Sequence, residues 1–356
     1  MILQSVTPQN FRNLASQPIA FHPRTNLVVG RNGQGKTNLL EAIYFLATTK
    51  SFRTTRIANV VRFGEGSVFV SGLLQRHGVE KTLSIGVEAA ELRRRVLMIN
   101  EERVTLHDYL SAVSVFAYSS ARLEILRGAP EERRRFLDRG VASIDPAYLR
   151  ELTRYARVLR QRNALLQSGS RGALDAWDAE FVSAAASVQN ARASYARALT
   201  EAFDEIVSRH GYHVRDLRMT YRPSSTADLQ QVRGEELRAR VSLVGPQRDN
   251  LDFTVDGRTA AEVLSGGEQK MLVLLLKFAK LELFRRRHEE SAVFLLDDLD
   301  AELDLEILQR LLLNLPAATQ VFATSAKEPV VGALEAGAHR RLVIENGRVT
   351  DGRDFV

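Results

Sequence analysis

The chain has 356 residues, no cysteine and a formal net charge of +6. The missing cysteines exclude disulfides, thiolate metal sites and cysteine-based catalysis. No segment approaches the ~18 consecutive apolar residues of a membrane span, and residues 1–13 lack the pattern of a secretory signal. These features predict a cytoplasmic protein without a membrane partner, long enough for two or three subdomains.

Arginine carries almost all of the positive charge. Only seven of the 49 basic residues are lysine, and residues 119–218 contain 17 arginines against 13 acidic residues. Two interpretations stay open, a bias of genomic composition and the recognition of phosphate groups. The composition therefore permits a nucleic-acid partner without identifying one.

Residues 1–118 show strand patterns around one long helix. Alternating or β-branched runs at 3–6 and 67–74 predict strands, and residues 95–106 predict a hairpin that turns at 100–102. The apolar positions from 39 to 46 have helical spacing. We interpret this region as the N-terminal lobe of a mixed α/β domain.

The clearest motif of the chain begins where a β-branched run ends at Gly30. Gly30, Gly35, Lys36 and Thr37 fit the pattern of a phosphate-binding loop, in which backbone N–H groups wrap phosphates at a helix N-terminus. We expect Lys36 to contact the β- and γ-phosphates of ATP and Thr37 to bind Mg²⁺. Taken alone, the stretch also fits a glycine-rich turn before an ordinary helix. The residues expected to bind the nucleotide are Gly30, Arg31, Asn32, Gly33, Gln34, Gly35, Lys36, Thr37 and Asn38.

The pattern is helical from Pro130 to about Arg209, which predicts an all-helical arm domain at residues 119–211, inserted into the α/β domain. Pro130 suits the first position of a helix, and the breaker at 168–170 separates one helix from a second around Trp177, which we expect in the core. A third, alanine-rich helix follows. Arg150, Arg154 and Arg157 share one helical face, which fits a DNA-backbone contact and a solvated surface equally well.

Strand patterns return in residues 212–356, the predicted C-terminal lobe. At 264–270 the sequence places Ser265, Gly266 and Gly267 at the start of an apolar helix, which makes a second anion site. One phosphate loop already serves one nucleotide, so we expect this site to close over the γ-phosphate of another chain's ATP. Ser265 then contributes to catalysis in an ATP-dependent homodimer.

A buried strand at 292–296 ends in two acids. We expect Asp297 to complete the Mg²⁺ site with Thr37, and Asp298 to orient the attacking water. Fast ATPases with these three motifs have glutamate at the second acid. Aspartate is one methylene shorter and would hold the attacking water less well, so we expect slow hydrolysis. A strand that ends in two acids is weak evidence by itself. It becomes strong evidence when it follows the phosphate loop and the second anion site in the expected order.

These motifs together resemble the head of an ABC-type ATPase, and other stretches narrow the resemblance to the RecF family of bacterial recombination mediators. It extends over almost the whole chain. The stretches are Asn10-Phe11-Arg12-Asn13, residues 30–43, Lys50-Ser51-Phe52-Arg53, Arg133-Arg134-Arg135-Phe136-Leu137-Asp138, Gln161-Arg162-Asn163-Ala164-Leu165-Leu166 and Gly245-Pro246-Gln247-Arg248-Asp249.

The resemblance implies an SMC-like α/β head with an inserted helical arm and a weak, DNA-stimulated ATPase that acts as a switch. It also implies binding to gapped DNA and single/double-strand junctions, and work with RecR and RecO in DNA repair, recombination, replication restart and the SOS response. Gln247 departs from the histidine usual in the family, and Tyr118-Ser119-Ser120 from an expected Pro-Glu.

Three other interpretations stay open at this point. The main one is the ATPase subunit of an ABC transporter, although 229 positions separate Lys36 from Ser265 and asparagine follows Thr37. A long coiled-coil SMC head requires sustained heptads, which the insert lacks. A nucleotide-gated scaffold with negligible turnover is the third.

Overall fold

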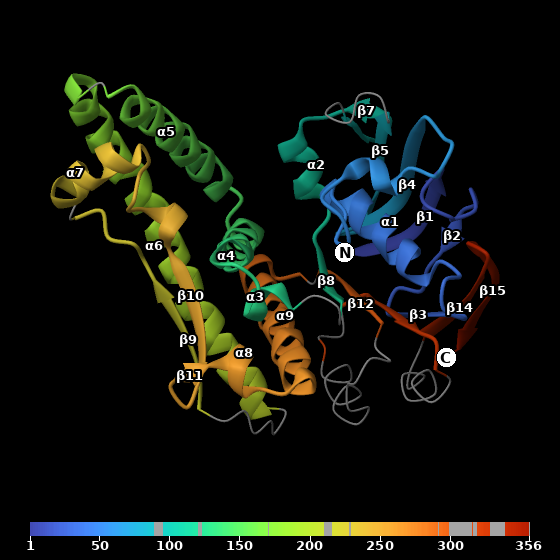
Figure 1. Ribbon diagram of the computed structural model, residues 1–356. Helices are drawn as coiled ribbons and strands as arrows, with labels where there is room; N and C mark the ends of the chain where they lie inside the picture. The colour runs from blue at the N-terminus through green and yellow to red at the C-terminus, as the bar shows by residue number, and fades with distance from the viewer. Residues whose placement is uncertain are drawn as a thin grey trace. The chain divides into compact units, whose positions relative to one another are not determined.

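The computed structural model describes residues 1–88, 95–119, 123–169, 171–209, 216–227, 229–290, 292–298, 315, 319–327 and 339–355. Two compact units make up the chain (Figure 1). Unit 1 contains residues 1–122 and 284–356, and unit 2 contains residues 123–283. Within the described ranges, no helix is both long and apolar enough to cross a membrane.

A six-stranded, mostly parallel sheet forms the base of unit 1. Its order is β15-β14-β3-β13-β12-β8, and only the edge strand β15 runs antiparallel to its neighbour. β12 and β13 are buried along their whole length, as expected for parallel strands covered on both faces. The strands are β3 (Thr25–Val29), β8 (Val115–Ser119), β12 (Val293–Asp297), β13 (Val321–Ser325), β14 (His339–Glu345) and β15 (Arg348–Phe355).

The second sheet of unit 1 is antiparallel, in the order β2-β1-β4-β5-β6-β7. The hairpin expected at 95–106 is confirmed, since β6 pairs with β7 through Met98 and Arg103. The strands are β1 (Ile2–Gln9), β2 (Ile19–Ala20), β4 (Ser67–Arg76), β5 (Val79–Glu88), β6 (Arg95–Ile99) and β7 (Glu102–Arg103). The short elements η1 (Ile57–Val60) and α2 (Leu106–Ala112) belong to the same unit.

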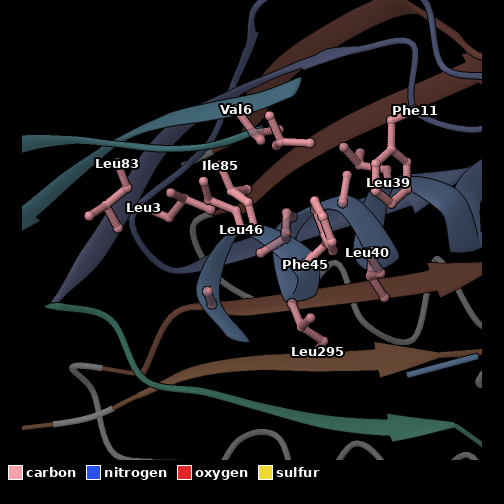
Figure 2. Close-up of a cluster of buried hydrophobic side chains, with 14 of the residues drawn as sticks. Leu3, Val6, Phe11, Leu39, Leu40, Phe45, Leu46, Leu83, Ile85 and Leu295 are labelled. Carbon is pink, nitrogen blue, oxygen red and sulfur yellow. The ribbon is translucent and has the colours of Figure 1, made fainter. Parts of the chain in front are cut away.

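Helix α1 (Lys36–Thr48) joins the two sheets into one core. Its apolar side chains leave it on both sides: Figure 2 shows Leu46 near Ile85 of the antiparallel sheet, and Leu295 of the parallel sheet below the helix. Leu39, Leu40 and Phe45 are fully buried. Burial on two faces fixes the position of α1, and with it the position of the loop that precedes it.

Unit 2 combines helices with a three-stranded antiparallel sheet, β11-β10-β9. Helices α5 and α6 pack side by side (Figure 1). The helices are α3 (Glu124–Arg127), α4 (Pro130–Ile144), α5 (Tyr148–Ser168), α6 (Arg171–Arg209), α7 (Leu229–Ala239), α8 (Ala260–Val263) and most of α9 (Gly266–His288), with the 3₁₀ turn η2 (Pro246–Arg248). The strands are β9 (Leu217–Arg222), β10 (Asn250–Val255) and β11 (Arg258–Thr259).

The arm differs from its prediction in the number of helices. The breaker is confirmed, because α5 ends at Gly169 with a φ of +71°. After it, one continuous helix, α6, replaces the two that the sequence predicted. No proline and no glycine after Gly172 interrupts α6, and alanine favours the helix. Trp177, expected in the core, is only half-buried.

The boundaries between units also differ from the expected ones. The sequence placed residues 212–283 with the C-terminal lobe, whereas their contacts group them with the helical arm. A buried ionic contact explains this division. Arg192 of α6 donates to Asp138 of α4 and, over 2.8 Å, to Asp249, which follows η2. Tyr221 of β9 donates to the same Asp249, so helices and sheet share one polar core.

A second fully buried arginine joins three helices of unit 2. Arg162 of α5 donates to Asp178 of α6 over 2.8 Å, to Glu236 of α7 over 2.6 Å and to Ser242 over 2.7 Å. Burial opposes the charge of Arg162, but its hydrogen bonds to Glu236 and Asp178 prevail and raise its pKa. The guanidinium therefore stays charged.

Removal of Arg162 should strongly destabilise unit 2. Arg162→Met leaves Glu236 buried without its cation and Asp178 with only a 3.6 Å contact to Arg233, and we expect a loss of about 3–5 kcal/mol in the free energy of unfolding. Arg160→Met, at an exposed position of the same helix, is the matched control and should change it by less than about 0.5 kcal/mol. Urea unfolding followed by circular dichroism measures both, and equal stability of the two variants would contradict the structural role of Arg162.

Candidate nucleotide-binding site

The predicted phosphate loop lies between β3 and α1, as the sequence indicated. Gly30 and Gly35 have φ angles of +149° and +120°, and a Cβ at Gly30 would come within 2.4 Å of the Ile344 carbonyl oxygen. Glycine is therefore required at Gly30 for both conformation and space. No side chain caps the N-terminus of α1, so its first-turn N–H groups remain suited to an anion.

The side chain of Lys36 folds back onto the loop. Its Nζ donates to the carbonyl oxygen of Gly30 over 2.7 Å and to that of Arg31 over 3.2 Å. The ammonium group thus lies inside the loop that the sequence predicts to bind phosphates. A phosphate there would meet a cation and the helix N-terminus together.

The turn between β14 and β15 supports the loop from the C-terminal end of the chain. The N–H of Gly347 donates to the Gln34 carbonyl oxygen over 2.7 Å, and the N–H of Asn346 donates to Gln34 Oε1 over 2.6 Å. Gln34 was expected to contact the nucleotide, and here its side chain holds the turn. Residue spacing does not indicate this contact, because its partners are 312 positions apart.

A polar network flanks the loop and gives a structural role to the stretches 10–13 and 50–53, to which no role was assigned from the sequence. Asn38 of α1 donates to Asn13 over 2.7 Å and accepts from Arg53 over 2.6 Å. One turn further along α1, the carboxylate of Glu41 is fully buried. Arg12 donates to both of its oxygens over 2.9 Å, and Arg53 forms a third contact at 3.4 Å. An arginine in each stretch was the available signal, but the sequence did not indicate their shared partner.

An open pocket of about 800 Å³ adjoins this network. Its lining includes Arg12, Asn13, Asn38, Arg62 and Phe63. The Phe63 ring is fully exposed. Residues 57–65 carry no recognisable motif, so this pocket was not predictable from the sequence.

The two acids expected at the end of a strand lie at the end of β12. Asp297 is 5% exposed, and its Oδ1 accepts a hydrogen bond from Thr37 Oγ1 over 2.9 Å. The structure thus brings together the two residues predicted to hold Mg²⁺. Thr324 Oγ1 donates to the same oxygen over 2.9 Å and accepts from the N–H of Asp298 over 2.8 Å.

Burial dominates the electrostatics of Asp297 and raises its pKa. Hydrogen bonds from Thr37 and Thr324 act in the opposite direction, and the nearby charge of Asp298 raises the pKa further. A hydroxyl and a carboxylate are hard oxygen donors, which suit Mg²⁺. Among the described residues, no group of three or more His, Asp or Glu side chains could hold a metal ion by itself.

The second anion site begins α9 in unit 2. Ser265 and Glu268 form a reciprocal capping box, in which the Ser265 N–H donates to Glu268 Oε2 over 2.8 Å and the Glu268 N–H donates to Ser265 Oγ over 3.3 Å. The N–H groups of Gly266 and Gly267 lie in the first turn, where no intrahelical acceptor exists. Buried Gln269 braces the site, since it accepts from Arg127 over 2.6 Å.

The three arginines of the expected DNA contact have different surroundings. Arg150 and Arg157 of α5 are exposed. Arg154 is half-buried and forms ion pairs with Glu180 of α6 at 2.8 Å and with Glu151 at 3.7 Å. The helical spacing placed all three on one face with Glu151 as the only acid nearby, but it did not indicate Glu180 of the neighbouring helix.

Comparison with known proteins assigns this chain to a family. The model of the RecF/RecN/SMC N-terminal domain matches residues 2–344. The DNA replication and repair protein RecF of Geotalea daltonii is 32% identical over 98% of this chain and 100% of its own length. This chain belongs to the RecF family.

Solved structures agree with this assignment. The recombination mediator protein RecF, described as RecF-ATP in the RecFOR pathway, has a TM-score of 0.87 at 25% identity and covers 100% of this chain and 98% of its own. An Smc head bound to the C-terminal winged-helix domain of ScpA has a TM-score of 0.59 at 15% identity, over 100% of this chain and 98% of its own. The predicted fold class, an SMC-type α/β head with a helical insert, is confirmed.

A substitution in the β14–β15 turn tests whether this turn supports the phosphate loop of this RecF family member. A Cβ at Gly347 would lie 1.9 Å from the Asn13 carbonyl oxygen, so Gly347→Ala must displace the turn and with it Gln34. We expect at least about a tenfold loss of ATP affinity, about 1.4 kcal/mol. Gly78→Ala is the control, because Gly78 has the same φ of +78° and open space around it. Fluorescent ATP titration measures the effect, and wild-type affinity of Gly347→Ala would refute the support.

The raised pKa of Asp297 yields a second test. Burial makes the folded protein favour the protonated form of Asp297. Its contribution to stability is therefore complete below the ordinary carboxyl pKa of about 4, and it is lost as the pH rises through the raised pKa of the folded state. Asp297→Asn removes the titration. The melting temperature without nucleotide and Mg²⁺ should then exceed that of the wild type at pH 8, by a margin that narrows toward pH 5. A variant that is less stable than the wild type at pH 8 would show that the ionised carboxylate stabilises the fold.

Proposed function

We propose that this RecF family member is an ATP-dependent DNA-binding protein of recombinational repair, in which ATP joins two chains and slow hydrolysis separates them. The observation that carries the proposal is the hydrogen bond between Thr37 and Asp297, because it unites a phosphate loop with a metal-binding carboxylate. The named relatives and the RecF-ATP structure support the family's chemistry. They favour this function over the ATPase subunit of an ABC transporter.

The nucleotide would occupy the loop of residues 30–38, with its phosphates on the N-terminus of α1 and on Lys36. Thr37 and Asp297 would hold Mg²⁺, which when bound neutralises charge on the β- and γ-phosphates. The pocket beside Asn13 and Asn38 has room for the base and ribose, and exposed Phe63 offers an aromatic surface there.

The second anion site, at residues 264–270, would complete the nucleotide site of a second chain. Its capped helix start presents the N–H groups of Gly266 and Gly267 to an anion, and each charge-assisted hydrogen bond to phosphate contributes roughly 1.5–3 kcal/mol. Several such bonds are enough for ATP to hold two heads together. Asp298 would orient the attacking water, and its short side chain favours slow turnover. A switch, rather than a fast motor, is the expected behaviour.

DNA at gaps and single/double-strand junctions is the proposed partner, with RecR- and RecO-type proteins as co-workers in loading a recombinase. The pathway named for the RecF-ATP structure supports these partners. Exposed Arg150 and Arg157 are the proposed backbone contacts, whereas the charge of Arg154 is already paired within the arm. DNA binding should stimulate the weak ATPase.

Two inactive variants test the shared site. Lys36→Ala should fail to bind ATP, and Ser265→Arg should bind ATP as a monomer without hydrolysis. In a mixed dimer, the intact phosphate loop of the Ser265→Arg chain faces the intact second anion site of the Lys36→Ala chain, which makes one complete site. ATPase activity should therefore return in part on mixing and rise with protein concentration.

Cross-linking provides the control for the mixing experiment, because it shows whether mixed dimers form. No recovery of activity in mixed dimers would contradict a site shared in the proposed way. No recovery is the result expected if the site lies within one chain, because each variant then lacks one of its essential groups.

The proposed DNA contact makes a separate prediction. Each phosphate neutralised by an arginine contributes about 0.9 to the slope of log affinity against log salt on duplex DNA. Arg150→Ala combined with Arg157→Ala should therefore weaken binding to gapped DNA and flatten this slope by up to about 1.8. Arg218→Ala is the control, because Arg218 is exposed in the same unit but paired with Asp216. An unchanged slope in the double variant would assign Arg150 and Arg157 to the solvent.

A further inference from the structure

Thr324 lies between the two acids at the end of β12, Asp297 and Asp298. The proposed function gives it no role. It belongs to β13 and is 1% exposed. Its hydroxyl donates to Asp297 Oδ1 over 2.9 Å and accepts from the N–H of Asp298 over 2.8 Å. A hydroxyl has a single proton, so these two bonds fix its direction: the proton points to Asp297 and a lone pair to Asp298.

Strand pairing explains why threonine reaches both acids. β12 and β13 are parallel, and Leu296 lies opposite Ala323. The next residues are Asp297 in β12 and Thr324 in β13. They therefore lie side by side at the carboxyl ends of the two strands. Threonine has a branched Cβ, which restricts its χ1 angle and holds the hydroxyl in place.

The backbone of Asp298 adds a second constraint. Its φ is +57°, in the left-handed region, which a residue other than glycine adopts only at a cost in energy. The hydrogen bond from its N–H to Thr324 stabilises this turn immediately after β12. The direction in which the Asp298 side chain leaves the backbone therefore depends on Thr324.

We propose that Thr324 is a positioning residue that couples the metal-binding carboxylate of Asp297 to the backbone of Asp298. The inference rests on the proposed Mg²⁺-dependent ATPase function. Thr37 and Thr324 donate to the same oxygen of Asp297, so a shift of that oxygen when the nucleotide site fills also shifts the acceptor of Thr324. Thr324 would pass such a shift to the N–H of Asp298, the residue proposed to orient water.

Thr324→Val tests the coupling, because valine keeps the shape of threonine and removes both hydrogen bonds. The coupling predicts that nucleotide affinity without Mg²⁺ stays within about twofold of the wild type, since the phosphate loop is intact. The gain in affinity on addition of Mg²⁺ and the value of kcat should each fall about tenfold or more, as for loss of a hydrogen bond to a charged group. Thr324→Ser keeps the hydroxyl and should restore both to within about threefold.

Thr48→Val is the matched control, since Thr48 belongs to the same unit and its hydroxyl bonds backbone groups, donating to the Tyr44 carbonyl oxygen over 2.7 Å and accepting from the Lys50 N–H over 3.3 Å. It should leave the Mg²⁺-dependent gain and kcat unchanged. The assays are titration of a fluorescent ATP analogue with and without Mg²⁺, steady-state ATPase measurement and thermal unfolding of each variant.

The outcomes separate this inference from the proposed function. A wild-type protein without Mg²⁺-dependent ATP binding would refute the proposed function and the coupling together. If the wild type binds and hydrolyses ATP, an unaltered Mg²⁺ gain and kcat in Thr324→Val would refute the coupling alone. Equal losses of affinity with and without Mg²⁺, together with a lower melting temperature, would show that Thr324 only supports the fold and would also overturn the proposal.

Discussion

The hydrogen bond between Thr37 and Asp297 is the contact on which the candidate site depends. It joins residues 260 positions apart over 2.9 Å. The order β3-β13-β12 within a parallel sheet makes this possible, because the carboxyl ends of these strands lie along one edge. Helix α1 then carries Thr37 to that edge, and its burial against both sheets leaves it little freedom to move. Core packing thus sets the geometry of the chemistry.

Buried ion pairs organise both units and give part of the arginine content a structural purpose. Arg12 in unit 1 and Arg162 and Arg192 in unit 2 each hold buried carboxylates through several hydrogen bonds. Arginine suits this task because its planar group donates in several fixed directions. Neither interpretation of the arginine bias offered by composition included this role. Exposed arginines such as Arg157 remain the ones available for phosphate contacts.

The sequence predicted the local parts of the site, because their geometry depends on neighbouring residues. Glycine spacing located the phosphate loop, and a buried run located the strand that ends at Asp297. The contacts between distant segments were not predictable in this way. The support of Gln34 by Gly347 and the shared partner of Arg12 and Arg53 depend on strand order and on helix packing. The same reason explains the missed unit boundaries, which depend on the burial of Arg192 beside Asp249.

We propose that ATP joins two chains of this RecF family member. Light scattering tests this by the molar mass of the wild-type protein, at several protein concentrations, with Mg²⁺ and either a non-hydrolysable ATP analogue or ADP. We expect a dimer with the ATP analogue and a monomer with ADP. A monomer at saturating ATP analogue, with nucleotide binding verified in the same sample, would contradict it.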